Sequence, residues 1–149
     1  MSRLSRRQAL ALTIGAPLMV RLTPASATPG AMQAAIASWS KGAAIEPGLV
    51  TLTLPLLVAS GNAVPLKVMV DSPMTPEDHV AEIAIFNERN PLPDVIRFHF
   101  TPASGRAQAE TRIRLSDTQK VHAIARLSDG TFRSAAVNVV VTAPACVEN

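Results

Sequence analysis

Seven segments of the chain have the apolar content, or the alternation of apolar and polar residues, that is typical of β-strands. They are residues 49–54, 64–70, 80–86, 95–100, 107–115, 120–127 and 132–141. The segment 80–86 is apolar enough for a helix or a strand, but its short length favours a strand. Turn signals separate the segments, and Asp129-Gly130 is a typical β-hairpin turn. Short strands at such regular intervals predict an all-β, immunoglobulin-like antiparallel β-sandwich.

Helical spacing of apolar residues occurs only ahead of these strands. The residues that show it are Met32, Ala35, Ile36 and Trp39. Gly42 would end such a helix. The predicted division of the chain is a short N-terminal helical segment at 28–44, the sandwich at 45–142 and a C-terminal arm at 143–149. Strands do not alternate with long helices, which argues against an α/β enzyme fold.

The first 27 residues have the three parts of an export signal. A basic start is followed by an apolar run at 9–20 and by the small residues of 25–27, Ala-Ser-Ala. The run is too short to span a bilayer core of roughly 30 Å as a helix. The pair Arg6-Arg7 is similar to a twin-arginine (Tat) signal. We therefore expect residues 1–27 to be a Tat-type signal peptide; the alternative is a buried N-terminal helix.

Removal of the signal changes the charge of the protein. The whole chain has 14 basic and 11 acidic residues, and the first 27 residues hold four arginines and no acid. The mature part then carries 10 basic and 11 acidic residues, a net charge of −1. The high isoelectric point comes from the signal, so charge gives no reason to expect nucleic-acid binding. Tyrosine is absent and other aromatic residues are few, which leaves no stacking platform for bases.

The one reactive group that stands out is the thiol of Cys146, the only cysteine. A lone cysteine in an exported protein indicates intermolecular pairing or a reactive thiol; the alternative is a small buried apolar residue. The histidines (His79, His99 and His122) have no ligand spacing. Asp78 and Glu82, near His79, are most simply solvated charges. We therefore predict no metal, no cofactor and no catalytic residues.

Four segments carry a family resemblance, and they occur in the family's order. They are "VDSPMTPEDHV" (70–80), "NPLPDVIRFHFTPASGRA" (90–107), "TRIRLSDTQKV" (111–121) and "LSDG" (127–130). They resemble the SoxY family, the sulfur carrier proteins of bacterial thiosulfate oxidation. The resemblance implies an immunoglobulin-like sandwich in the periplasm that pairs with a SoxZ-like sandwich. It also implies a carrier without its own active site, which presents sulfur intermediates on a cysteine near the C-terminus, here Cys146, to partner enzymes.

The arm departs from the family pattern. The family ends in Gly-Gly-Cys-Gly-Gly, whereas this chain has Pro-Ala-Cys-Val-Glu-Asn at 144–149. The added Cβ atoms and the fixed φ of Pro144 make the arm bulkier and straighter. Four residues beyond Thr142 would give a reach of about 13 Å. Glu148 should disfavour the Cys146 thiolate and repel anions unless a partner supplies positive charge.

Two functions from different classes follow. The first is a periplasmic carrier that holds sulfur substrates covalently on Cys146. The second is an interaction module whose thiol tethers it to another protein or forms a disulfide-linked homodimer. A metal-carrying role that combines Cys146 with Met69, Met74 or a histidine is weaker, because no ligand spacing supports it.

Overall fold

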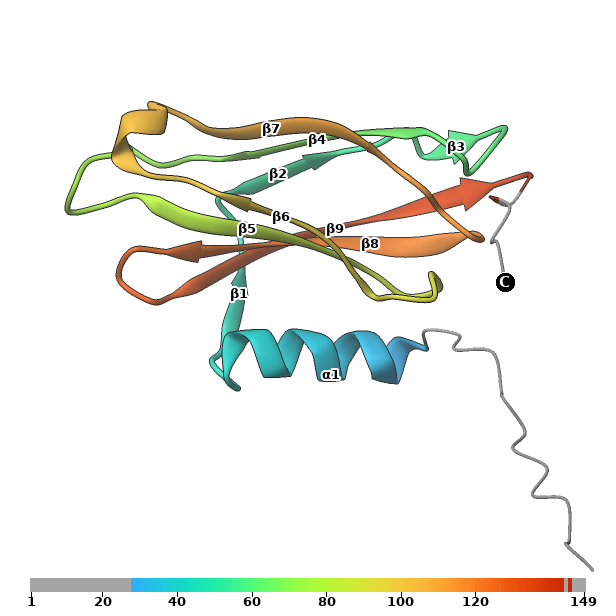
Figure 1. Cartoon of the computed structure of the whole chain (residues 1–149), viewed down its shortest axis with the longest axis horizontal. Helices are drawn as coiled ribbons and strands as arrows, with labels where there is room; N and C mark the ends of the chain where they lie inside the picture. Colours follow the sequence, from blue (N-terminus) through green and yellow to red (C-terminus); the bar gives the residue numbers. More distant parts are fainter. Residues whose placement is uncertain (1–27, 144, 146–149) are drawn as a thin grey trace, which may run out of the picture.

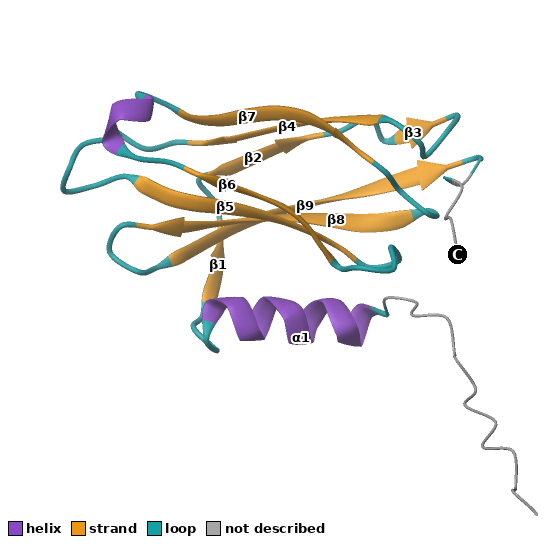
Figure 2. Cartoon of the chain, in the orientation of Figure 1, coloured by secondary structure: helices purple, strands orange, loops and turns teal. Residues whose placement is uncertain are grey.

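The computed structural model describes residues 28–143 and 145. Within these residues one helix, α1 (Pro29–Ser40), precedes nine strands and a single turn of 3₁₀-helix at Pro102–Ser104. The strands are β1 (Ile45–Pro47), β2 (Val50–Thr53), β3 (Leu57–Val58), β4 (Val64–Val70), β5 (Val80–Asn87), β6 (Asp94–His99), β7 (Ala107–Ile113), β8 (Gln119–Leu127) and β9 (Phe132–Val141). Figure 2 shows the predominance of strands. No helix among the described residues is long and apolar enough to cross a membrane.

The strands form two stacked sheets (Figure 1). One sheet has the order β1-β9-β8-β5-β6, with β3 also paired to β9, and the other has the order β2-β4-β7. Every pairing is antiparallel except those of β1 and β3 with β9, which are parallel. The prediction of an immunoglobulin-like, mostly antiparallel sandwich is confirmed.

The core between the sheets follows from the period-two alternation. In β4 every second residue is buried, and β2 pairs with it so that Val50 faces Val70 and Leu52 faces Val68. Branched side chains from the inner faces of both sheets fill the space, as expected for stacked sheets about 10 Å apart. The sequence alternation therefore decides which face of each strand is buried.

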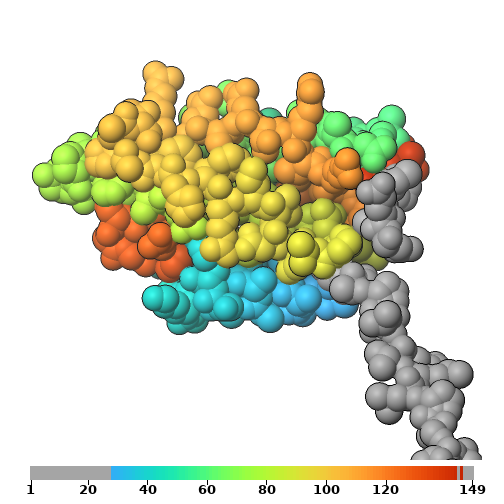
Figure 3. Space-filling model, viewed as in Figure 1, coloured from blue at the N-terminus to red at the C-terminus, as the bar shows by residue number. Residues whose placement is uncertain are grey.

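Helix α1 covers part of the outer face of the six-stranded sheet (Figures 1 and 3). The Thr28 hydroxyl accepts the Ala31 N–H at 3.2 Å and caps the helix start. Met32 and Ile36 are buried against a second apolar cluster that includes Ala84, Phe86, Ile124 and Phe132. The helix ends one residue before Gly42 was expected to end it, because Lys41 takes the left-handed conformation at φ 54°.

Two strands, β1 and β3, were not predicted. Each is two or three residues long and contains or follows a proline, Pro47 or Pro55. They exist because β9 offers a free edge, so backbone pairing rather than side-chain pattern defines them. Strand β1 precedes β2 and strand β3 follows it, so the two pairings with β9 hold the chain just before and just after its passage through the three-stranded sheet.

Candidate functional site

The C-terminal arm leaves the sandwich from the end of β9, and hydrogen bonds fix its first residues. The Thr142 N–H donates to the Val58 carbonyl at 3.0 Å, and the Thr142 hydroxyl lies 3.1 Å from the Ala59 carbonyl oxygen. The Ala143 carbonyl accepts the Gly61 N–H at 2.9 Å. Strand β9 therefore passes directly into backbone that is held against the loop after β3.

Gly61 lies at the centre of this attachment. Its carbonyl accepts the Leu115 N–H at 2.8 Å, and the Leu115 carbonyl accepts the Ala145 N–H at 3.2 Å. A Cβ atom at position 61 would lie 2.0 Å from the Leu115 carbonyl oxygen and 3.0 Å from the Ala145 nitrogen. Only glycine lets the three segments approach so closely. We call Gly61, Leu115, Ala143 and Ala145 the arm clamp.

Cys146 lies outside the described residues, as do Arg6, Arg7 and the rest of 1–27, so their roles stay predictions. The arm clamp nevertheless changes the estimate of reach. The estimate began at Thr142, but the chain is still held at Ala145, which is buried and only 5% exposed. The estimate of reach therefore has to start at Ala145 instead of Thr142.

Two arginines lie at the C-terminal end of β7, next to the arm clamp. Arg112 is in the strand, and Arg114 immediately precedes Leu115. Both are exposed, and neither forms an ion pair within residues 28–143 and 145. A neighbouring positive charge favours a thiolate over a thiol. The sequence interpretation looked only to a partner for positive charge and did not consider these two residues beside the arm clamp.

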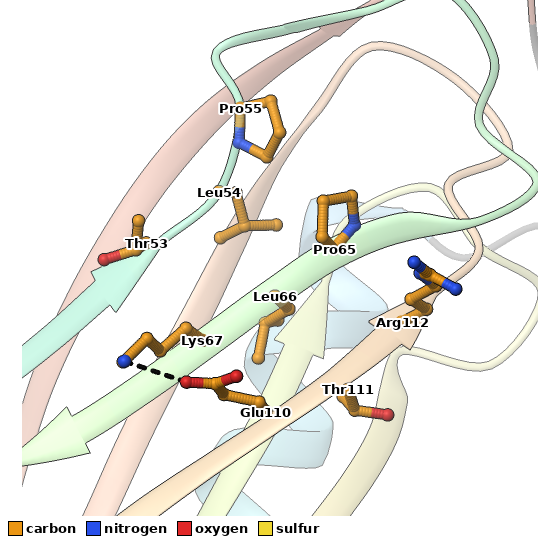
Figure 4. A pocket seen from close by; sticks show the side chains of 9 residues that line it. All are labelled: Thr53, Leu54, Pro55, Pro65, Leu66, Lys67, Glu110, Thr111 and Arg112. Atoms are coloured by element: carbon orange, nitrogen blue, oxygen red, sulfur yellow. Dashed lines mark ion pairs between the residues drawn. The ribbon is translucent and has the colours of Figure 1, made fainter.

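A groove of about 700 Å³ runs along the outer face of the three-stranded sheet at the same end. Figure 4 shows Pro55 and Pro65 at one end of the groove and the ion pair of Lys67 and Glu110, 2.8 Å long, at the other. Arg112 lines it as well. The Lys67 ammonium lowers the pKa of Glu110 below its ordinary value, chiefly through a hydrogen bond.

Exposed apolar residues also gather near the arm clamp. Leu56 and Leu57 are 69% and 65% exposed, and Leu57 pairs with Val140, which is 46% exposed. Scattered apolar residues are normal on a surface, but these three are adjacent through β3 and β9. The end of the sandwich that holds the arm therefore combines apolar side chains with uncompensated positive charge.

The histidines are not brought together as ligands. His79 Nδ1 lies 3.1 Å from the Thr75 carbonyl oxygen, and His99 Nε2 is 4.0 Å from Glu82. His122 is half-buried on the face of β8 that lies toward α1. Burial lowers its pKa, and the positive charge of Lys120 lowers it further. No group of three His, Cys, Asp or Glu residues within the described part of the chain is arranged to hold a metal ion.

The interpretation of Glu82 as a solvated loop charge is wrong. Glu82 lies within β5, is 4% exposed, and receives a hydrogen bond of 2.9 Å from Arg126. Arg97 approaches its other oxygen at 3.7 Å. The sequence signal that could have identified it is the strand itself, since Val80 to Phe86 continues through position 82.

The fold and the sequence now define the class of protein. The architecture is an immunoglobulin-like sandwich domain, and the model of the family described as sulfur oxidation protein SoxY matches residues 36–146, which is more than half of the chain. The chain belongs to the SoxY family. No curated protein sequence matches it.

Solved structures agree on the fold. The sulfur carrier protein SoxY from Chlorobium limicola f thiosulfatophilum is similar with a TM-score of 0.63 and 23% identity, over 74% of this chain and 96% of that one. The superoxide reductase (neelaredoxin) from Ignicoccus hospitalis has a TM-score of 0.57 and 16% identity, over 77% and 94%. The superoxide reductase from Nanoarchaeum equitans gives 0.55 and 13%, over 64% and 100%. At these identities the likeness shows the shared sandwich alone.

Proposed function

We propose that this protein is a sulfur-substrate carrier that holds its cargo covalently on Cys146 and has no active site of its own. The observation that carries the proposal is that the SoxY family match runs through residue 146. The arm clamp adds support, because it fixes the chain up to the residue before the cysteine. The carrier needs only an accessible thiolate, and the arginines at the clamp favour that form.

The loading step has a defined balance. The Cys146 thiolate and thiosulfate form a sulfur–sulfur bond and give a cysteine S-thiosulfonate, with two electrons passing to an oxidant that a partner redox enzyme supplies. Hydrolysis of the distal group by a second partner adds one water, releases hydrogen sulfate and leaves a cysteine persulfide. The sandwich contributes attachment and presentation, and the partners contribute the catalysis.

The proposal includes the setting of the chemistry. Residues 1–27 direct export to the periplasm through the Tat route, and the mature sandwich pairs with a SoxZ-like subunit. Recognition by the Tat route depends on the paired arginines, so the double substitution Arg6→Lys and Arg7→Lys should leave the precursor unprocessed in the cell. The measurement is the mass and the periplasmic share of the protein; the lysine variant exported as well as the wild type would contradict the route.

Intact mass spectrometry of the protein from its own host, before and after reductant, tests the carrier role. A reductant-labile adduct of sulfur or sulfonate mass that Cys146→Ser abolishes is the expected result. An unmodified thiol, even after exposure to thiosulfate and a partner extract, would contradict the carrier. A mass equal to two chains that collapses on reduction would instead favour the tethering or homodimer alternative.

The variant arm is tested separately. Replacement of residues 144–148 by Gly-Gly-Cys-Gly-Gly restores the family pattern in the same sandwich. If the native partners load both arms equally well, the Pro-Ala-Cys-Val-Glu sequence confers no partner specificity. We expect them to discriminate, because the side chains and the proline of the native arm make it bulkier and straighter than a glycine-rich arm.

A further inference from the structure

A second polar pocket lies at the opposite end of the six-stranded sheet from the arm clamp. It has a volume of about 420 Å³ and opens between the C-terminal end of α1 and the sheet. Lys41 at the end of the helix, Arg97 in β6 and Arg126 in β8 all line it, together with Glu82 and Trp39. Four separate elements therefore bring charged or aromatic groups to one cavity.

The charges in the pocket are unbalanced. Three cationic side chains and the Glu82 carboxylate line the cavity, and Asp94 just outside it pairs with Arg97, so one positive charge is left in excess. Glu82 uses one oxygen for the 2.9 Å bond from Arg126, while its other oxygen is buried and accepts no hydrogen bond from the described residues. Lys41 is exposed and forms no ion pair with the described residues.

The aromatic wall of the pocket is held in place by its neighbours. The Trp39 ring lies 5.2 Å from that of Phe132, edge to face, and 5.8 Å from that of Phe86. The Arg97 guanidinium lies 5.9 Å from the Trp39 ring centroid, and Asp94 bonds the same guanidinium on another side. These contacts fix the Arg97 head group at the cavity before any ligand arrives.

We propose that this pocket binds a small oxyanion, either a sulfur oxyanion or the carboxylate of a small organic acid. Guanidinium groups match the planar or tetrahedral oxygens of such ions, and Arg126 retains donors beyond the one it gives to Glu82. The negative end of the α1 dipole faces the same space, so the anion sits against the arginines rather than against the helix end. Glu82 then lowers the affinity for the anion through charge repulsion, although its hydrogen bond also holds Arg126 in position.

The site contains its own reporter, because Trp39 is the only tryptophan of the chain. The mature protein is titrated with sulfate, thiosulfate or acetate against sodium chloride of the same ionic strength, and Trp39 emission is recorded. Thiosulfate is also titrated into Cys146→Ser, which separates this pocket from chemistry at the arm. Saturable change with at least one oxyanion is expected, and the preference among the three identifies the source of the ligand.

Two substitutions with opposite expected effects make the test specific. Lys41→Gln should weaken binding about fivefold, while Lys67→Gln, the same change on the other sheet, should leave it unchanged. Glu82→Gln removes the opposing charge and should tighten binding by roughly tenfold, an increase that mere destabilisation of the sandwich would not produce. No saturable emission change, equal effects of the two lysine substitutions, or weaker binding by Glu82→Gln would each overturn the proposal.

Discussion

Substitution of Gly61 by alanine is the sharpest test of how the arm is held. The new Cβ would lie 2.0 Å from the Leu115 carbonyl oxygen, a backbone atom that cannot rotate away. Either the loop that contains Gly61 or the Leu115 segment must move. The movement removes the bonds from Gly61 to Ala143, from Leu115 to Gly61 and from Ala145 to Leu115.

The expected loss follows from these three bonds. Each contributes about 1 kcal/mol net, so the free energy of unfolding should fall by about 3 kcal/mol if all three break. Burial of Ala145 adds little, because its side chain is a single methyl group. The loss is local, so the apolar core between the sheets should keep its packing.

Urea unfolding followed by circular dichroism measures the global cost, and amide hydrogen exchange at Leu115 and Ala145 measures the local one. Gly30→Ala is the matched control, since its Cβ would meet nothing nearer than 3.7 Å and alanine favours a helix. A Gly61→Ala protein that unfolds within about 0.5 kcal/mol of the wild type, with both amides still protected, would refute the account of the clamp.

Three further outcomes are expected. Phe86→Ala should lower the free energy of unfolding by about 3–5 kcal/mol and shift Trp39 emission to the red, because the Trp39 ring of α1 packs against the Phe86 ring beneath the helix. Burial lowers the pKa of His122, so the unfolded chain takes up its proton first; stability should hold above about pH 6.5 and fall as the pH drops through the lowered pKa. His122→Gln should flatten that loss in urea midpoints from pH 8 to 5. Arg114→Gln should slow the reaction of Cys146 with an anionic disulfide reagent about two- to fivefold at low salt, but not with a neutral reagent; equal slowing of both would contradict an electrostatic role.

The sequence predicted strands well where only one face of the strand is buried. Strand β4 alternates cleanly, and its pattern identified both the strand and its inner face. Strand β5 was ambiguous because it is buried on both faces, between the core and α1, so its apolar residues do not alternate. The strands β1 and β3 escaped prediction because they are defined by the edge of β9 rather than by their own side chains.

The site was predictable only in part. Cys146 stood out as the only cysteine, and its role stays a prediction, whereas the arm clamp depends on contacts between positions 61, 115 and 145, which are far apart in the sequence. Gly61 lies among the turn residues between two predicted strands, and the sequence does not reveal that its lack of a Cβ is what admits the Leu115 carbonyl. Glu82 was misplaced because the arginines that accompany it come from β6 and β8.

The parallel pairing of β1 and β9 has a mechanical consequence. The chain enters β1 from the helix and leaves β9 toward the arm, so tension between these two points pulls adjacent parallel strands in opposite directions along their length. Their interstrand bonds would then be loaded together in shear, rather than opened one after another like a zipper. The Leu57–Val58 pairing gives β9 a second such attachment next to the arm. A sandwich joined in this way resists a pulling force applied at its C-terminal arm without unfolding strand by strand from that end.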